Sequence, residues 1–448
     1  MVITGRCGRQ GVWDASAQAT RPDDVVLSAV RVHLVVWCGA PPGMCKAHDV
    51  PPEQPASAAN NRLSVGFDAT PLLGRPTGVG VFCAGALTGL AGRDDVSVSA
   101  YAVSWRRRKG IDSLLPRGIG SGQRPMPARP LHAAWARGSL PPLEWFVGRT
   151  DVVHGSNFVV PPTRAAARVV TVHDLTVVRF PELCDAPTLA FPGLIRRAVA
   201  EGAWVHTPSS FVADEVAAEF GVDPERVRAV HHGVPELPAP PPGGGAAADP
   251  AVSGGGVPAL PAGCDRYVLT IGTVEPRKDY PLLVQAYAAV AAEHPDVALM
   301  IVGGDGWGME SFTEALDASP VRSRILRPGY LDGAALAATL RAASVLAYPS
   351  RYEGFGFPPL QAMAEGVPVV ATAAGAVPEV VGDGAWLVPP GDRDALADRL
   401  AAALDGGPEV DSLIARGRNR AAGFSWDACA AGLVDLYRDA ARSNGGPR

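Results

Sequence analysis

One local pattern recurs along most of this chain: a short apolar run of strand length is followed by a longer segment with helical spacing. The pattern occurs in 62–234 and again in 265–424, on either side of a stretch rich in Pro, Gly and Ala at 235–264. Strands that alternate with helices pair in parallel, because each helix carries the chain back across the sheet. The sequence therefore predicts an α/β fold: two Rossmann-like, doubly wound domains that face a cleft, joined by a linker that cannot itself pack a core.

The individual elements follow from the apolar periodicity. Strands of the first domain are predicted at 63–68, 96–103, 151–154, 169–173, 204–207 and 227–230, and those of the second at 267–272, 298–303, 325–328, 345–348, 368–371 and 385–388. Helices are predicted at 81–90, 188–201, 210–220, 360–364 and 425–441, with a tail at 442–448.

Residues 1–61 lack any core-forming period, and we interpret them as a disordered extension or an over-extended translation start. An apolar run at 25–37 has the length of a signal-sequence core. Arg31 and His33 interrupt it, however, and no clear cleavage pattern follows.

Composition excludes several classes of protein. The net charge of −5 gives no case for a nucleic-acid partner. The seven cysteines are scattered, odd in number and without a C-x-x-C pair, which argues against a disulfide framework or a zinc site. The sequence contains no run of 18 apolar residues, so no membrane-spanning helix is predicted. A reducing cytoplasm is the predicted location.

A basic cluster with an aromatic residue, Trp105-Arg106-Arg107-Arg108-Lys109, lies between two predicted strands. It is suited to peripheral contact with an anionic membrane at the inner face. A solvated loop is the alternative interpretation.

The stretch 344–368 combines several signals. An apolar strand ends at Pro349-Ser350, a glycine-rich loop holds Glu353, and Pro358-Pro359 opens a helix that Gly366 ends. Such a loop presents backbone N–H groups at a helix N-terminus, where anionic or hydroxyl-rich ligands are favoured. The Glu353 carboxylate is suited to accepting hydrogen bonds from ligand hydroxyls.

The run Glu353-Gly354-Phe355-Gly356-Phe357-Pro358-Pro359-Leu360 resembles the E-x7-E signature of retaining family-4 glycosyltransferases, which have the GT-B fold. The second carboxylate of the signature falls at position 361, where this chain has Gln361. The resemblance extends over about 62–440. It implies that Phe355, Gly356, Phe357 and Gln361 bind the donor, with Gln361 at the ribose, and that the helix at 425–441 crosses back to the first domain.

Two motifs of the first domain fit the same resemblance. The turn after the first strand contains Gly78 and Gly80, which the resemblance places against the donor diphosphate and the acceptor; a tight turn is the alternative. His173-Asp174 ends a buried strand, at the sheet edge that faces the ligand crevice in open α/β sheets. The resemblance places this histidine beside the anomeric carbon of the donor sugar. Accordingly, His173, Asp174 and Glu353 are the predicted catalytic residues.

The second domain opens with a strand followed by two adjacent cations, Arg277 and Lys278. A leaving nucleoside diphosphate needs its charge neutralised, and Arg and Lys supply donors for that purpose. The family's Arg/Lys pair matches these positions, and Gly303 matches a turn that approaches the nucleotide. No cofactor is predicted and no divalent metal is required. The adjacent His231 and His232 lack a carboxylate at ligand spacing.

The resemblance implies a retaining hexosyltransferase that uses a nucleoside diphosphate sugar, with GDP-mannose as the expected donor and a glycan or lipid-linked acceptor, in surface polysaccharide assembly. Two alternatives stay open. One is a sugar-phosphate synthase or phosphorylase on the same fold, although the single lysine of the second domain, Lys278, argues against a pyridoxal-dependent enzyme. The other is a non-catalytic nucleotide-sugar-binding protein, which Gln361 favours.

Overall fold

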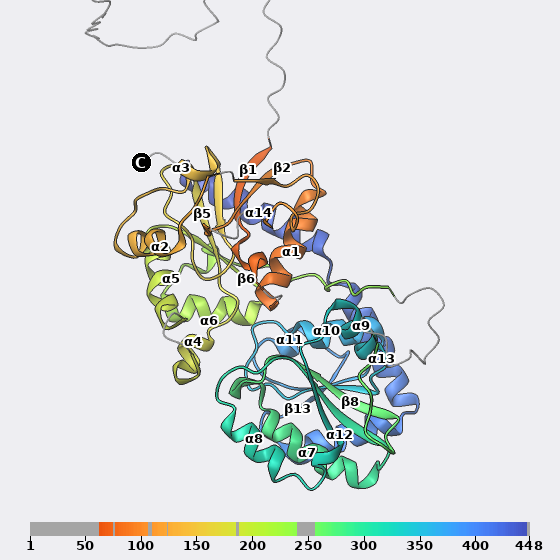
Figure 1. Cartoon of the computed structure of the whole chain (residues 1–448). Helices are drawn as coiled ribbons and strands as arrows, with labels where there is room; N and C mark the ends of the chain where they lie inside the picture. Colours follow the sequence, from red (N-terminus) through yellow and green to blue (C-terminus); the bar gives the residue numbers. More distant parts are fainter. Residues whose placement is uncertain are drawn as a thin grey trace, which may run out of the picture. The chain divides into compact units, whose positions relative to one another are not determined.

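The computed structural model describes residues 62–74, 77–105, 110–122, 124–184, 188–239 and 256–445. Within them the chain forms two parallel β-sheets with helices packed around each (Figure 1). This confirms the predicted α/β class with two doubly wound sheets. The predictions for 1–61, for the basic cluster at 106–109 and for the middle of the linker fall outside the described residues.

The first sheet has seven strands in the order β3-β2-β1-β4-β5-β6-β7. Its strands are β1 (Leu63–Asp68), β2 (Val96–Tyr101), β3 (Gly120–Ser121), β4 (Val152–Gly155), β5 (Ala167–Thr171), β6 (Trp204–Thr207) and β7 (Val227–Ala229). Its helices are α1 (Gly78–Ala91), α2 (Ala128–Arg137), α3 (Glu144–Val147), α4 (Thr176–Arg179), α5 (Phe191–Ala200) and α6 (Ser210–Phe220).

The second sheet has six strands in the order β10-β9-β8-β11-β12-β13. Its strands are β8 (Arg266–Ile271), β9 (Val297–Val302), β10 (Ile325–Gly329), β11 (Val345–Tyr348), β12 (Val369–Thr372) and β13 (Trp386–Val388). Its helices are α7 (Tyr280–Glu293), α8 (Glu310–Asp317), α9 (Gly333–Arg341), α10 (Phe357–Glu365), α11 (Val377–Val381), α12 (Arg393–Asp405) and α13 (Pro408–Ala422).

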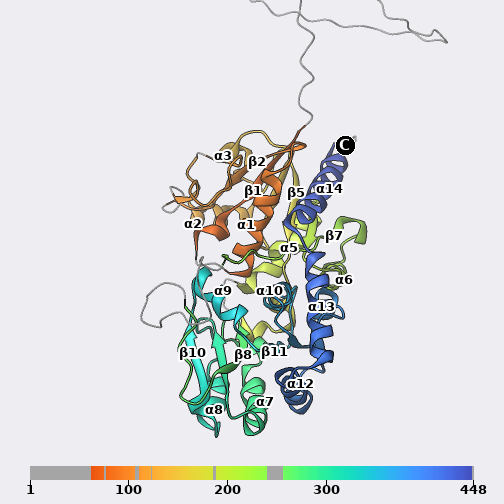
Figure 2. The ribbon, with the colours of Figure 1, turned by 90° about the vertical axis from the view of Figure 1, so that its right-hand side faces the viewer.

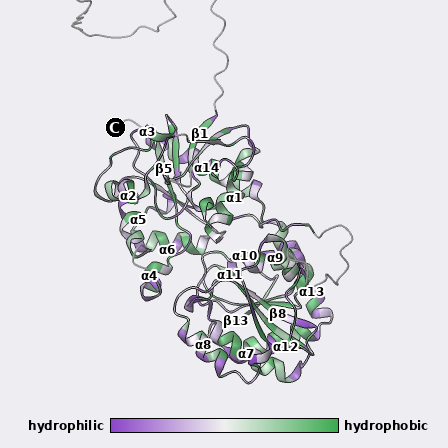
Figure 3. Ribbon diagram, in the orientation of Figure 1, coloured by the Kyte–Doolittle hydropathy of each residue, from purple (hydrophilic) through white to green (hydrophobic). Residues whose placement is uncertain are grey.

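Burial on both faces explains why the strands read as continuous apolar runs. Every residue of β4, β9, β11 and β12 is buried, as expected for parallel strands covered by helices on each side. In Figure 3 the strands of both sheets carry mostly the green of apolar residues. Among the described helices, none is both long and apolar enough to cross a bilayer.

The last helix, α14 (Trp426–Asn444), follows the second-sheet helices in sequence but packs on the first sheet, next to α1 (Figure 2). Its buried residues Leu433, Leu436 and Tyr437 belong to the core that α1 and β1 share. Close packing against α1 depends on Gly85, where a Cβ atom would lie 2.1 Å from the Trp426 ring. The crossover expected from the family resemblance is therefore present.

The described ends of the linker place three partly buried side chains, Leu237, Val257 and Leu260, against the apolar core of the second sheet. They add to that core and form none of their own. The helix predicted to begin at Val81 begins at Gly78 instead, where the Thr77 side chain accepts a hydrogen bond from the Gly80 N–H. This Thr cap satisfies one of the backbone N–H groups that a helix start leaves open.

Candidate functional site

A cavity of about 480 Å³ lies at the carboxyl ends of strands from both sheets. Residues next to the ends of β8, β9, β11, β5 and β6 line it, together with the start of α1. In the second sheet the strand order reverses between β8 and β11. The helices that follow such strands leave on opposite faces, which opens a crevice where ligands of α/β proteins bind.

A buried cluster of opposite charges forms the floor of this cavity. Glu353 Oε1 lies 2.6 Å from Lys278 Nζ, and Glu353 Oε2 lies 2.6 Å from Arg277 Nη1. Arg277 Nη2 donates to Glu275 Oε1 at 2.7 Å, and Lys278 Nζ donates to Tyr348 Oη at 3.1 Å. Two cations thus face two carboxylates, and the four side chains are only 8–16% exposed.

The environment of this cluster shifts its pKa values. Burial alone would raise the pKa of the Glu353 carboxyl, but the charges of Arg277 and Lys278 outweigh burial and lower that pKa to about 2. Burial lowers the pKa of the Lys278 ammonium group, against the opposing effect of Glu353. Glu353 is therefore an ionised carboxylate that accepts hydrogen bonds and donates none.

Two loops bring these charges together. Arg277 and Lys278 lie in a 3₁₀ turn, Pro276–Lys278, between β8 and α7. Glu353 lies in the loop between β11 and α10, and the Arg351 N–H of that loop donates to the Arg277 carbonyl at 2.8 Å. Gly354 makes the close approach to the first domain possible, because a Cβ atom there would lie 1.9 Å from the His173 carbonyl oxygen.

The structure brings His173 and Asp174 to the same cavity. His173 Nε2 lies 2.8 Å from the Ser156 carbonyl oxygen. Because a carbonyl only accepts, Nε2 carries the proton and Nδ1 is left as an acceptor. Burial lowers the pKa of His173, which favours this neutral form. Asp174 Oδ1 accepts from the Thr176 N–H at 2.9 Å.

The other predicted donor-site residues divide into two groups. Gly80 is buried in α1, against the Pro71 carbonyl, and does not line the cavity. Gln361, which could instead have turned into the core, is half-buried and lines the cavity. The remaining predicted residues that line it are Gly78, Gly303, Phe355, Gly356 and Phe357.

His232 is a cavity residue that sequence reasoning set aside. It is 2% exposed, lines the cavity and stacks on Phe82 at 4.5 Å between ring centroids and on Phe357 at 5.4 Å. Neither ring nitrogen has a hydrogen-bond partner within the described part of the chain. Burial lowers the pKa of His232 well below its usual value, so the ring is neutral.

Sequence reasoning also missed hydrogen bonds between the loops of the first sheet and those of the second. Tyr352 Oη accepts from the Leu175 N–H at 2.9 Å and donates to Glu215 at 2.5 Å. Ser209 Oγ donates to the Gly354 carbonyl at 2.9 Å. Glu379 Oε1 accepts from the Ser210 N–H at the start of α6 at 2.8 Å. These bonds join residues far apart in sequence, so no local pattern announces them.

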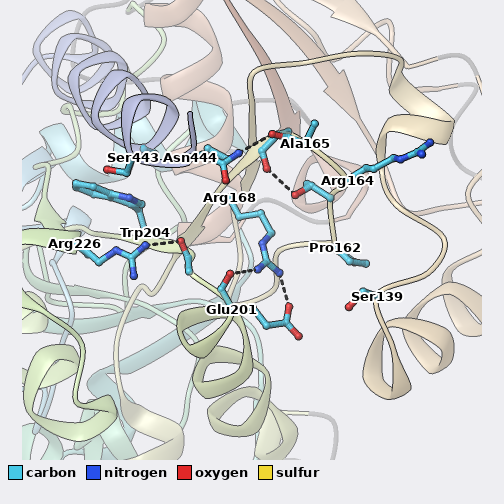
Figure 4. A pocket seen from close by; sticks show the side chains of 15 residues that line it. Ser139, Pro162, Arg164, Ala165, Arg168, Glu201, Trp204, Arg226, Ser443 and Asn444 are labelled. Carbon is cyan, nitrogen blue, oxygen red and sulfur yellow. Dashed lines mark hydrogen bonds and ion pairs between the residues drawn. The ribbon is translucent and has the colours of Figure 1, made fainter. Parts of the chain in front are cut away.

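A second cavity, of about 380 Å³, lies at the opposite ends of β5 and β6 (Figure 4). Two of the three arginines that line it are engaged: Arg168 pairs with Glu201 at 2.7 Å, and Arg226 donates to the Gly202 carbonyl at 3.0 Å. Both arginines thus hold the C-terminal end of α5. Function in parallel α/β sheets concentrates at the other edge, and the 480 Å³ cavity is the candidate site.

In the ranges given above, no group of three or more His, Cys, Asp or Glu side chains is arranged to hold a metal ion.

Comparison with known proteins agrees with this architecture. The family model "Glycosyl transferases group 1" matches residues 260–420, and the model "Glycosyltransferase Family 4" matches residues 76–236. O-antigen chain mannosyltransferase B of Escherichia coli is 28% identical over 300 residues, which are 64% of this chain and 74% of that protein. D-inositol 3-phosphate glycosyltransferase of Actinosynnema mirum is 31% identical over 317 residues, which are 65% of this chain and 73% of that protein.

Among solved structures, sucrose-phosphate synthase from Thermosynechococcus elongatus has a TM-score of 0.61 at 19% identity, covering 84% of this chain and 99% of that one. At this identity the likeness speaks for the fold alone. The family models, the relatives and the two-sheet fold agree: the chain belongs to the family-4, group-1 glycosyltransferases and is a glycosyltransferase with the GT-B fold.

Proposed function

We propose that this glycosyltransferase moves a hexose, with retention of anomeric configuration, from a nucleoside diphosphate sugar held in the 480 Å³ cavity. The observation that carries the proposal is the buried cluster of Arg277, Lys278 and Glu353 at the carboxyl ends of the second-sheet strands. It joins two cations that suit a diphosphate to a carboxylate that suits sugar hydroxyls.

The diphosphate is proposed to bind at Arg277 and Lys278. In the absence of ligand these cations balance Glu353 and Glu275, so the cluster has no excess positive charge. Additional attraction comes from the N-terminus of α10, whose first residue Phe357 lines the cavity. A preorganised anion site of this kind stabilises the charge that develops on the leaving phosphate.

Metal independence is part of the proposal, because Arg277 and Lys278 line the cavity as hydrogen-bond donors for the diphosphate that a divalent ion would otherwise bind. Transfer is expected to persist in excess EDTA. A strict requirement for added Mg²⁺ or Mn²⁺ would contradict this assignment of the cations.

Retention is proposed to follow a front-face course, in which the leaving phosphate takes the acceptor proton. Three carboxylates in the described residues line the cavity: Asp174, Glu275 and Glu353. Glu275 and Glu353 are both ion-paired to Arg277, which disfavours either as a nucleophile that forms a covalent intermediate. His173 is proposed to accept a hydrogen bond from the donor sugar through Nδ1.

Mannose from GDP-mannose is the proposed donor group, and a glycan or lipid-linked saccharide the proposed acceptor. The similarity to an O-antigen chain mannosyltransferase supports both. The test is nucleotide release by purified protein from GDP-mannose, UDP-glucose and ADP-glucose, with NMR of the anomeric proton of the product. We expect fastest turnover with GDP-mannose and an α-linked product. A β-linked product would exclude retention, and no release from any donor would favour a binding protein without activity.

Peripheral contact with an anionic membrane is proposed through the segment that begins at Trp105. This side chain is 62% exposed, and tryptophan is enriched at membrane–water interfaces, where its apolar ring and its N–H group both find partners. Flotation with vesicles of phosphatidylglycerol and phosphatidylcholine tests the contact. Binding that is equal for the wild type and Trp105→Ala would exclude this residue from it.

A further inference from the structure

A cavity of about 430 Å³ adjoins the proposed donor cavity and shares Asp174, Glu275 and Arg277 with it. We call it the aromatic pocket; its other walls include Phe158, Phe191, Trp307 and Glu182. Neither the donor nor the phosphate chemistry described above uses it. Its shared wall means that a ligand there would lie directly beside the donor sugar.

The rings of Phe158 and Phe191 form one wall. They stack with centroids 4.9 Å apart and an interplanar angle of 12°. Trp307, in the loop between β9 and α8, is 48% exposed. An indole that is about half exposed at a cavity wall offers apolar surface to a ligand.

Phe158 holds its position at a cost in backbone energy. Its φ is +58°, in the left-handed region that residues other than Gly, Asn and Asp rarely adopt. The Phe158 N–H donates to the Thr171 carbonyl at 2.9 Å, which fixes the unusual turn. The turn places the ring edge-on to His173, with centroids 5.8 Å apart. Strain of this kind concentrates at ligand sites, and here it sets an aromatic ring next to a predicted catalytic residue.

Three carboxylates complete the pocket: Asp174, Glu182 and Glu275. Ionised carboxylates only accept hydrogen bonds. A group of hydroxyls can donate to them. The cation of this pocket, Arg277, is already paired with Glu275 and Glu353, so the remaining carboxylates disfavour a phosphate or carboxylate ligand. An acyl chain would satisfy the aromatic rings but would leave the carboxylates desolvated without partners.

A neutral pyranose matches both sets of groups, because one of its faces consists of C–H bonds and its rim consists of hydroxyls. We propose that the aromatic pocket is the subsite for a neutral pyranose at the reactive end of the acceptor. This rests on the proposed transfer reaction and narrows the acceptor to a saccharide terminus, rather than a phosphorylated or purely lipidic one.

Saturation-transfer NMR with GDP-loaded protein tests the subsite. The probes are the methyl pyranosides of mannose, glucose, galactose and rhamnose, with mannose 6-phosphate as an anionic comparison. We expect at least one methyl pyranoside to bind and mannose 6-phosphate not to bind. Trp307→Ala should lower the affinity for the pyranoside by about three- to tenfold, the contribution of one aromatic contact. Trp307→Phe should restore most of that affinity.

Trp145→Ala is the matched control, since Trp145 is 52% exposed and lies outside the pocket; it should bind the probes as the wild type does. The proposal is overturned if no neutral pyranoside binds to protein that binds GDP, or if Trp307→Ala binds them unchanged. GDP affinity is measured on the same samples. If the wild type does not bind GDP, the result counts against the proposed donor site. Failure of the donor-site proposal can therefore be told apart from failure of the acceptor-subsite proposal.

Discussion

The carboxylate of Glu353 lies 2.6 Å from the ammonium group of Lys278, a residue 75 positions earlier in the chain. The proposed sugar-binding carboxylate and the proposed phosphate-binding cations are therefore one electrostatic unit. A change in either one alters the charge that the other experiences, and variants have to be interpreted with this coupling in mind.

Replacing Glu353 with Gln should reduce both stability and transfer. The substitution leaves Arg277 and Lys278 with an excess of buried positive charge, and breaking a buried pair in this way typically costs about 3–5 kcal/mol. GDP should partly restore stability by supplying negative charge. Differential scanning fluorimetry should show a lower melting temperature without ligand and a larger GDP-induced increase than in the wild type.

Glu201→Gln provides the comparison for that experiment, because the Glu201 ion pair with Arg168 is far from the cavity. It should leave the GDP-induced increase at the wild-type value. If Glu353→Gln behaves like Glu201→Gln, the cluster does not couple to the phosphate.

Gln361 tests how the ribose is held. On the proposed binding mode, Gln361 accepts from one ribose hydroxyl and donates to the other, because an amide has both functions. Gln361→Glu should tighten GDP binding by about 1 kcal/mol, since a charged acceptor forms stronger bonds. Gln361→Leu should lower the affinity for GDP and for guanosine by the same factor, because both contain the ribose. Calorimetric titration that finds equal affinity for Leu and Gln at this position would exclude ribose contact.

Much of the fold could be predicted from local patterns. The strands β1, β6 and β11 and the helix α6 have the predicted bounds, since buried parallel strands leave continuous apolar runs. The predicted cations and carboxylate of the site also reach one cavity, because polar residues after parallel strands meet at one sheet edge.

What could not be predicted depends on contacts between distant segments. The ion pairs of Glu353 had no local signal, and the carboxylate was expected to face ligand hydroxyls alone. Neither ring nitrogen of His232 has a hydrogen-bond partner in the described part of the chain. This depends on which residues surround the ring in space, and the neighbouring sequence does not reveal them. The apolar residues near the linker ends were too sparse to form a pattern, yet they pack on the second sheet.

Stability should decrease as the pH falls below neutrality. Burial lowers the pKa of His206 to about 3 and also lowers the pKa values of His154 and His232. The unfolded chain binds these protons below about pH 6.5 while the folded chain does not, so the unfolded state gains relative stability as the pH falls from 6.5 towards 3. His206, whose pKa in the folded chain is about 3, costs about 2 kcal/mol of stability between pH 7.5 and pH 5.

Asp68 opposes this trend, because burial raises its pKa to about 6. As the pH falls, the folded chain binds this proton before the unfolded chain does, which stabilises the folded state. Burial also raises the pKa of Asp279, but two carboxyls do not offset the buried histidines, among them His173, whose pKa burial also lowers. Urea unfolding at pH 7.5 and pH 5 measures the difference, and His206→Gln should reduce it by about 2 kcal/mol. An unchanged difference in that variant would show that His206 is protonated equally in both states.

The most direct test of the donor-site account is calorimetric titration of GDP and guanosine into the wild type and Arg277→Ala. Only GDP carries the diphosphate, and a charge-assisted hydrogen bond is worth about 1.5–3 kcal/mol. Arg351→Ala serves as control, because Arg351 lies on the neighbouring loop but its side chain is 59% exposed. The account predicts that Arg277→Ala lowers the affinity for GDP by about 10- to 150-fold and leaves the affinity for guanosine nearly unchanged. Arg351→Ala should have little effect on the affinity for either ligand. Equal weakening of GDP and guanosine by Arg277→Ala would contradict the account, because it would show that this arginine supports the structure of the cavity and does not bind the phosphates.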